Sequence, residues 1–272
     1  MSQSDLMSPL PLIMVAPNGA RRTKADHPAL PVTIAETVAT AKACFEAGAG
    51  ALHAHVRDAT GAHVLDAGLY RELLAEMRSA VPGMLAQITT EAVGRYSPGE
   101  QRALVRDVLP DAVSIALREM IPTDDVAAAQ AFYTLLHSRG CAVQHIVYDA
   151  ADLDRFFDLT AAGVLPGNRH QLLFVLGRYA VGQQSDPSDL EPFLDTLQGR
   201  RGDLDLDWAV CAFGHQETAC LVEAVRRGGK ARIGFENSLW NADGAVAADN
   251  AERVRDLVSA LEGDGLMRAA SA

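Results

Sequence analysis

The chain has 272 residues, of which 49% are hydrophobic, so it can bury one sizeable core. Its formal net charge is -11, and no basic run is longer than Arg21-Arg22 or Arg226-Arg227, which excludes a nucleic-acid surface built on phosphate contacts. No apolar stretch approaches the roughly 20 residues that cross a bilayer, and the start of the chain lacks the pattern of an export signal. We therefore expect one cytoplasmic domain over residues 1–272 that acts on a small molecule, with neither nucleic acid nor a membrane as partner.

Short β-rich runs alternate along the chain with segments that carry helix start and stop signals. Strands are predicted near 12–17, 51–57, 85–90, 112–117, 142–148, 172–177, 207–213 and 230–236. Helix starts are predicted at three capping-box motifs, Thr33-Ile-Ala-Glu36, Ser97-Pro-Gly-Glu100 and Ser188-Asp-Leu-Glu191. The alternation predicts a parallel sheet, and eight β/α units favour an α/β fold of the TIM (β/α)8 barrel type over an open doubly wound sheet.

Four cysteines are scattered along the chain without any Cys-x-x-Cys pair: Cys44, Cys141, Cys211 and Cys220. This spacing does not resemble a disulfide framework in a chain of this length. We expect reduced thiols buried in the core.

Two histidines, His53 and His55, lie on the predicted strand 51–57, and apolar residues alternate with them. Side chains two apart on a strand share a face and lie about 7 Å apart, so two imidazoles can approach one ion from inside the barrel. A single strand histidine is more often a hydrogen-bonded core residue. The pair makes a zinc site the sharper hypothesis.

The last predicted strand, 230–236, places Arg232, Gly234 and Glu236 on its inward face by the same alternation. Strand 8 of a barrel closes against strand 1, which pairs with strand 2, so Glu236 is the natural third ligand beside the histidines. Two histidines and a glutamate with an open fourth position are typical of a catalytic zinc site.

Other polar residues are predicted at strand ends, where barrel enzymes have their active sites. Thr89 and Ser114 carry hydroxyls suited to an oxyanion or carboxylate, although ordinary strand-end hydrogen bonding explains them equally well. His215 follows the seventh predicted strand and is a candidate substrate group. The loop Asn18-Gly-Ala-Arg-Arg-Thr-Lys24 is cationic in an acidic protein, so it is either an anion clamp or a solvated surface loop.

Taken together, these segments resemble the beta-keto acid cleavage enzyme family over almost the full length of the chain. The resemblance is carried by Asn18-Gly-Ala-Arg-Arg-Thr-Lys-Ala-Asp26 with Pro28-Ala-Leu-Pro31, His53-Ala-His55-Val-Arg-Asp58, Gln87-Ile-Thr-Thr90, Phe174-Val-Leu-Gly177, Trp208-Ala-Val210 and Arg232-Ile-Gly-Phe-Glu-Asn237.

The resemblance implies a TIM barrel and a divalent metal, usually zinc, on His53, His55 and Glu236. It also implies a reaction of a β-keto acid with acetyl-CoA that gives acetoacetate and a new CoA thioester by Claisen and retro-Claisen steps. Thr89 and Ser114 would then bind substrate oxygens, and Arg232 would position the base and the thioester. Family members are expected to be homo-oligomers, often tetramers.

Two departures from the family pattern bear on the chemistry. Where the family commonly has a Glu-Asp pair, with the aspartate proposed as the base that deprotonates acetyl-CoA, this chain has Glu236-Asn237, and an amide cannot act as that base. Asp58, Glu91 and Glu119 are the candidate substitutes. Arg21 stands where the amino-substrate member has a glutamate, which predicts a neutral-polar or anionic β-keto acid.

Two other functions are compatible with the same pattern. Histidine pairs on a strand also occur in metal-dependent hydrolases of the barrel type, where zinc activates water, although those barrels usually add a lysine and a late aspartate as ligands. A non-catalytic barrel that keeps the metal and the pocket but lost its base at Asn237 is the other alternative.

Overall fold

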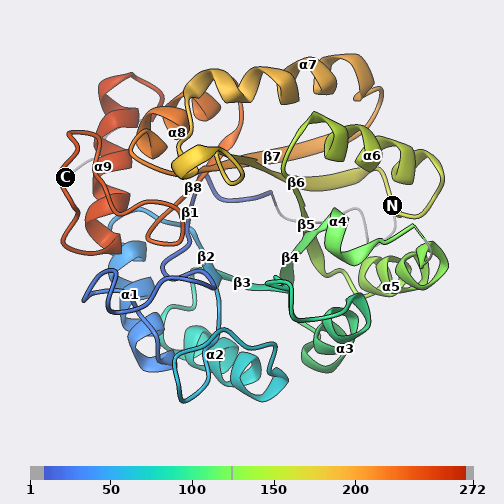
Figure 1. Cartoon of the computed structure of the whole chain (residues 1–272), viewed down its shortest axis with the longest axis horizontal. Coiled ribbons are helices and arrows are strands. Elements are labelled where there is room, and N and C mark those ends of the chain that lie inside the picture. The colour runs from blue at the N-terminus through green and yellow to red at the C-terminus, as the bar shows by residue number, and fades with distance from the viewer. Residues whose placement is uncertain (1–8, 124, 268–272) are drawn as a thin grey trace.

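The computed structural model describes residues 9–123 and 125–267. Within these ranges eight parallel strands form a closed barrel in which strand order follows the chain (Figure 1). The strands are β1 (Ile13–Val15), β2 (Ala51–Ala54), β3 (Leu85–Thr89), β4 (Ala112–Ala116), β5 (Ala142–Val147), β6 (Arg169–Leu176), β7 (Asp205–Ala212) and β8 (Lys230–Ile233). Because β1 pairs with both β2 and β8, the sheet has no open edge, which confirms the TIM barrel over the open sheet.

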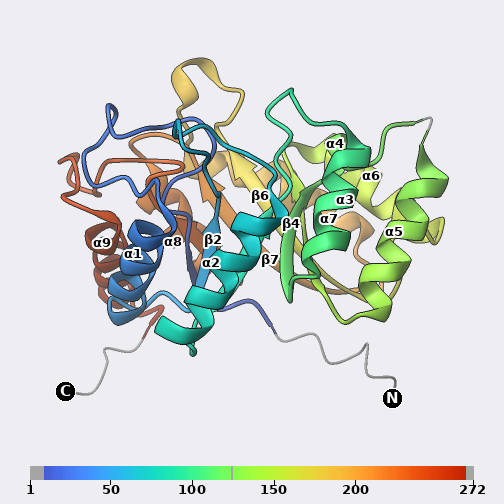
Figure 2. The ribbon, with the colours of Figure 1, turned by 90° about the horizontal axis from the view of Figure 1, so that it is seen from below.

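The helices surround the barrel, and the segments that follow the strands gather at one end of it, which lies at the top of Figure 2. The helices are α1 (Ile34–Glu46), α2 (Ala67–Ala80), α3 (Pro98–Val108), α4 (Leu117–Met120), α5 (Val126–Ser138), α6 (Ala150–Ala161), α7 (Glu191–Arg200), α8 (Glu217–Arg226) and α9 (Asn250–Gly263), with 3-10 turns η2 (Val181–Gln183) and η3 (Pro187–Leu190) after β6. None of the helices in the described ranges is both long and apolar enough to cross a bilayer.

Two apolar layers fill the fold. The larger layer lies between the outward faces of the strands and the helices, and the smaller layer, which includes Met14, Leu173 and Cys211, fills the barrel. All four cysteines are free and buried, as predicted. Polar side chains also enter the barrel interior from β2, β3, β5 and β8, and among them are His53, Gln87, Gln144 and Arg232.

Both strands that carry the predicted ligands end earlier than expected. β2 ends at Ala54, so His55 follows it, and β8 ends at Ile233, so Glu236 lies in a turn beyond the strand. Gly234 causes the second break, because it adopts φ +140° and a Cβ there would stand 2.5 Å from the carbonyl oxygen of Ala16. The prediction that Glu236 belongs to the last strand was therefore wrong.

Two of the three predicted capping boxes are present, at Thr33–Glu36 and Ser97–Glu100. The third was placed wrongly. Asp186 and Asp189 make the reciprocal cap at the start of η3, and α7 begins without a side-chain cap. The reason is Pro187, which favours the first helical position and makes the residue before it the cap.

Replacing Glu36 by glutamine is expected to lower the free energy of unfolding at pH 7 by at most about 1 kcal/mol, because its pair with Lys24 is exposed and screened by solvent. The hydrogen bond from Lys24, followed by that from the Thr33 amide, lowers the pKa of Glu36 to about 2. The carboxylate therefore stabilises the fold above its unfolded pKa near 4.5, and this stabilisation is lost as the pH falls toward 2. Urea unfolding of both proteins at several pH values measures this, and a difference that persists at pH 2 would contradict it.

Candidate functional site

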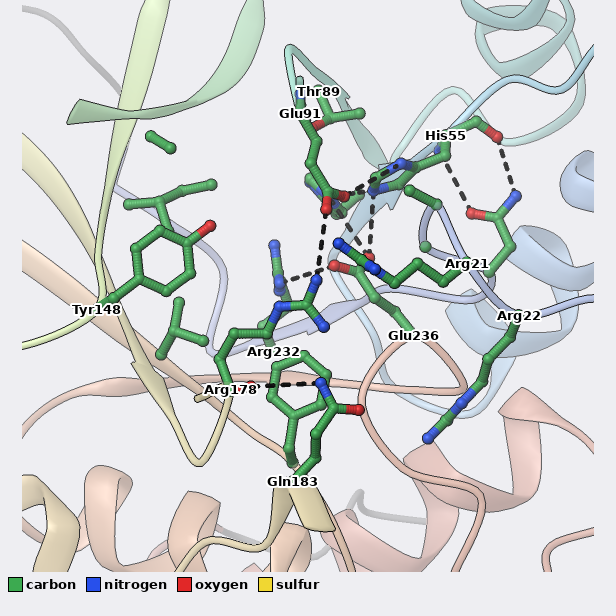
Figure 3. Close-up of a pocket in the computed structure, with 18 of the residues that line it drawn as sticks. Arg21, Arg22, His55, Thr89, Glu91, Tyr148, Arg178, Gln183, Arg232 and Glu236 are labelled. Atoms are coloured by element: carbon green, nitrogen blue, oxygen red, sulfur yellow. Dashed lines mark hydrogen bonds and ion pairs between the residues drawn. The ribbon is translucent and has the colours of Figure 1, made fainter. Parts of the chain in front are cut away.

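A pocket opens at the end of the barrel where the strands finish, and its empty space, including the part open to solvent, is about 730 Å³. His53, His55, Arg232 and Glu236 lie on one side of it. The opposite wall is mainly apolar and is formed by Ala116, Ile146, Tyr148, Val175 and Phe213. Figure 3 shows the side chains of Glu91, Arg178 and Glu236 pointing toward the centre of the pocket beside His55. Most residues that line the pocket are polar or charged, and polar groups that converge beside an apolar wall can orient a small polar molecule.

Three potential metal ligands meet in this pocket. One donor atom each from His53, His55 and Glu236 lies within 4.8 Å of the others. The two Nε2 atoms are 3.2 Å apart, and Oε2 of Glu236 lies 3.5 Å from the first and 3.4 Å from the second. Both imidazoles are almost completely buried. The structure thus brings together the three residues predicted as ligands.

The other nitrogen of His53 is already committed to a hydrogen bond. Nδ1 lies 2.8 Å from Oε1 of Gln87, whose Nε2 donates to Oε1 of Gln144 at 3.2 Å. Gln144 in turn donates to the carbonyl of Leu172. This series fixes the Gln87 oxygen toward His53, so Nδ1 of His53 carries the proton and Nε2 keeps its lone pair. Burial, followed by Arg232, lowers the pKa of His53 to about 3 and keeps the ring neutral.

The donor set fits a divalent cation. Oε2 of Glu236 is buried and has no hydrogen-bond partner within residues 9–123 and 125–267. Burial opposes its charge, yet Arg232 holds the pKa of Glu236 well below its usual value, so the group is a carboxylate. Two imidazoles and a carboxylate facing one another suit zinc and leave a position open.

Backbone contacts place His55 and Glu236 side by side. The Asn18 side chain accepts a hydrogen bond from the backbone N–H of His55 and donates to its carbonyl at 2.9 Å. Gly19 adopts φ +58°, and a Cβ there would lie 2.6 Å from Cγ of Glu236. Arg57 donates to the carbonyls of both Asn18 and Gly19. The Asn-Gly pair of the cationic loop therefore shapes the ligand cluster.

Arg232 contacts the ligand cluster from inside the barrel. Its Nη2 donates to Oε1 of Glu236 at 3.1 Å and to the Cys211 sulfur at 3.3 Å. Its Nε and Nη1 are buried and have no hydrogen-bond partner in the part of the chain that the structure describes, although the residue lines the pocket. A buried guanidinium with unused donors is suited to bind an anion that enters the pocket.

The three candidate carboxylates lie in different surroundings. Asp58 is solvent-facing and accepts hydrogen bonds from Thr60 and Ala62 in a turn outside the pocket. Glu119 lines the pocket, but its Oε2 accepts from the Ala92 amide and from Gln101. Glu91 also lines the pocket, and among the described residues its carboxylate oxygens lie 3.8 Å from Nδ1 of His55 and 3.8 Å from Nη2 of Arg178.

The cationic side chains of the pocket have different roles. Arg21 is exposed and extends over the pocket toward Glu236, whereas Arg22 points away from the cluster (Figure 3). Arg22 is used structurally, because it donates to the carbonyls of Phe235 and Asn237. Arg178 lies over the Phe213 ring and is half-enclosed near Glu91. Arg21 and Arg178 are thus the pocket cations that an anionic substrate would meet first.

The remaining predicted residues fall into two groups. Thr89 lines the pocket, and its hydroxyl oxygen accepts a hydrogen bond from the backbone N–H of Glu91. The hydroxyl can therefore still donate its proton to a substrate oxygen. Ser114 and Asn237 are fully buried and do not line the pocket. The Ser114 hydroxyl lies 3.5 Å from Nδ1 of His53, and the side-chain amide of Asn237 has no hydrogen-bond partner among the described residues. His215 stacks on Trp240 outside the pocket lining.

Sequence reasoning missed one buried histidine of the site. His63 is 4% exposed, and its Nδ1 lies 3.3 Å from Nδ1 of His55. It follows the turn sequence Asp58-Ala-Thr-Gly61, and this turn was the signal that the chain folds back beside His55. Asp58 and Gly61 close the turn, and residue 63 then pairs antiparallel with Arg57.

Known proteins are similar to this chain in sequence and in fold. The chain belongs to the beta-keto acid cleavage enzyme family, which it matches over residues 11–271. It is 28% identical over 257 residues to the 3-oxoadipate:acetyl-CoA acetyltransferase of Cupriavidus necator, covering 92% of this chain and 88% of that protein. It is 26% identical over 254 residues to the 3-keto-5-aminohexanoate cleavage enzyme of Fusobacterium nucleatum, covering 91% and 89%.

Among solved structures, the fold is similar to ObcA in its binary complex with oxaloacetate, with a TM-score of 0.72 and 16% identity. The match covers 88% of this chain but only 64% of that structure, so the chain spans less than two thirds of it. At this identity the likeness supports the fold alone. The family membership confirms the resemblance found in the sequence and makes the chain a member of an enzyme family.

Proposed function

We propose that the chain is a zinc-dependent acyltransferase that converts a β-keto acid and acetyl-CoA into acetoacetate and a new acyl-CoA thioester. The observation that carries this proposal is the meeting of His53, His55 and Glu236 at the wall of the pocket. The printed activities of the relatives, including a 3-oxoadipate:acetyl-CoA acetyltransferase, support the reaction class.

The proposed metal is zinc held by Nε2 of His53, Nε2 of His55 and Oε2 of Glu236. When bound, it would supply a Lewis acid that polarises the oxygens of the keto acid and stabilises negative charge on them. Gln87 keeps the first imidazole in the correct tautomer, and Arg232 keeps Glu236 ionised.

The atom balance of the reaction specifies what the protein must do. Acetoacetate keeps carbons 1 and 2 of the keto acid and gains the acetyl group, so carbon 2 first loses a proton and bonds to the acetyl carbonyl carbon as CoA thiolate leaves. The thiolate then attacks carbon 3, the bond between carbons 2 and 3 breaks, and carbon 2 regains a proton. One group must therefore accept and return a proton at carbon 2.

Glu91 is the proposed acceptor of that proton. Asn237 is an amide and is buried away from the pocket lining, Asp58 lies outside the pocket, and the Glu119 oxygen is committed to two hydrogen bonds. Glu91 has a carboxylate that faces the pocket beside the ligand cluster and has no close hydrogen-bond donor (Figure 3). It can therefore take a proton without breaking a structural contact.

Oxygen atoms of the substrate have donors available on the same side. The Thr89 hydroxyl and the unpartnered Nη1 of Arg232 are proposed to bind the keto acid or thioester oxygen. Ser114 lies behind His53, so we propose that it helps to hold that imidazole in place and does not itself bind substrate oxygens.

The proposed substrate is neutral-polar or anionic at the end remote from the keto acid group, because Arg21 and Arg178 line the pocket. Replacing Arg21 by glutamate is expected to lower kcat/KM for a β-keto dicarboxylate by about 10- to 100-fold, since it removes a charge-assisted hydrogen bond and adds repulsion. Initial rates with dicarboxylate and trimethylammonium keto acids measure the preference, with Arg139→Glu, on the exposed end of α5, as control. Preference of the unaltered protein for cationic keto acids would overturn the assignment.

The deciding experiment incubates zinc-loaded protein with acetyl-CoA and a panel of β-keto acids and follows acetoacetate by chromatography. Acetoacetate that forms only when both substrates are present supports the proposal. Turnover without acetyl-CoA would instead identify a hydrolase, and no turnover with any acid would identify a non-catalytic binding protein.

The proposal extends to the whole protein as a cytoplasmic homo-oligomer in which residues 1–272 form one barrel domain. The ends of that range, 1–8 and 268–272, lie outside the described residues. Sedimentation equilibrium of the purified chain tests the oligomeric state.

A further inference from the structure

We propose that His63 is a positioning residue that fixes His55 in the tautomer with its proton on Nδ1, and so keeps Nε2 of His55 free to bind the metal. This inference rests on the proposed metal site. It assigns a task to a residue that the reaction itself does not use.

The hydrogen-bond partners of His63 determine where its own proton lies. Nε2 of His63 is 3.0 Å from the backbone carbonyl of Glu91, which can only accept a hydrogen bond. A neutral His63 ring therefore carries its proton on Nε2 and has a lone pair on Nδ1. That lone pair faces Nδ1 of His55 at 3.3 Å.

The proton position on His63 determines the tautomer of His55. Because Nδ1 of His63 accepts, Nδ1 of His55 must donate, and the neutral His55 ring then has no proton on Nε2. That Nε2 is the atom that lies 3.2 Å from Nε2 of His53 and 3.4 Å from Oε2 of Glu236. Without this hydrogen bond the proton of the neutral His55 ring can instead lie on Nε2, which is 3.4 Å from Oε2 of Glu236, and there it blocks the ligand atom.

Local structure holds His63 in this place. The turn at Asp58 and Gly61 returns the chain antiparallel to the segment after β2, so that residue 63 pairs with Arg57. The His63 and His55 rings are 4.9 Å apart between centroids, and both rings are buried. The two ligand histidines thus have separate supports: the glutamine pair behind His53 and His63 behind His55.

The test compares two near-isosteric substitutions. His63→Asn keeps an oxygen acceptor close to the position of Nδ1, whereas His63→Leu removes every acceptor. We expect the leucine variant to bind Zn²⁺ about 10- to 100-fold more weakly in competition with a chromophoric chelator, and the asparagine variant to retain most of the affinity. Thermal unfolding of the metal-free proteins controls for loss of the fold.

The second readout needs neither metal nor turnover. In ¹⁵N-histidine-labelled, metal-free protein, the His55 ring nitrogens should show protonated Nδ1 and unprotonated Nε2, and His63→Leu should shift this toward a tautomer mixture. An unchanged His55 tautomer together with unchanged Zn²⁺ affinity in the leucine variant would overturn the inference. If the unaltered protein binds no Zn²⁺, the proposed metal site fails, while the tautomer measurement still decides the role of His63.

Discussion

Replacing Glu236 by glutamine is expected to lower the affinity for Zn²⁺ by more than about 100-fold and to abolish acetoacetate formation. Substitutions outside the ligand set typically cost 10- to 100-fold, and this change removes the only negative charge of the set itself. Metal content after dialysis and the rate of acetoacetate formation measure the two effects. Glutamine has nearly the same shape as glutamate, so the contact with Gly19 is kept.

The matched control is Glu76→Gln on the exposed face of α2, which makes the same chemical change away from the pocket. It should leave both metal content and rate unchanged. Retention of a full equivalent of zinc by the Glu236 variant would show that the metal is bound elsewhere. If the variant loses activity but keeps its metal, the role of Glu236 is its ion pair with Arg232 and not metal binding.

The order and type of the elements could be predicted because apolar residues follow period two in the strands and helical spacing between them. Strand boundaries were harder. β6 and β7 begin at Arg169 and Asp205, earlier than their apolar runs, since these two residues pair across the strands and form an ion pair at 3.2 Å. Such polar residues join a strand because they pair with a residue of the adjacent strand, and the sequence alone does not specify that pairing.

The grouping of His53, His55 and Glu236 was predictable for a related reason. His53 and His55 project inward because β2 and the residue after it keep the extended alternation, and the barrel closure brings the end of β8 close to them. Glu236 reaches the same place from a turn that begins at Gly234. The sequence pattern found the residue, but the glycine geometry that positions it depends on contact with Ala16.

The supports of the site were not predictable from one sequence. Gln87, Gln144 and the Leu172 carbonyl belong to β3, β5 and β6, and β4 lies between the first two, so their contact depends on the register of four successive strands. The position of Ser114 behind His53 also depends on that register. The position of a residue at a strand end indicates that it lies near the pocket. Whether its side chain lines the pocket or contacts a proposed metal ligand from behind depends on how the strands pack together.

Replacing Glu91 by glutamine is expected to lower kcat by about 100- to 10,000-fold, the range that a positioned general base contributes. Zinc content and the affinity for the keto acid should change little, because the Glu91 carboxylate touches the ligand cluster only at 3.8 Å and its backbone carbonyl still accepts from His63. Stopped-flow or steady-state rates give kcat, and keto acid binding can be followed by titration calorimetry without acetyl-CoA.

Two control substitutions make the Glu91 result specific. Asp58→Asn makes the same carboxylate-to-amide change in the turn outside the pocket and should leave kcat unaltered, since an amide oxygen can still accept from Thr60 and Ala62. Glu119→Gln tests the other pocket carboxylate. If Glu91→Gln keeps the full rate while Glu119→Gln loses it, the base is Glu119. If both variants keep the rate, proton transfer at carbon 2 uses neither carboxylate, and the loss of the family aspartate at Asn237 is compensated in another way.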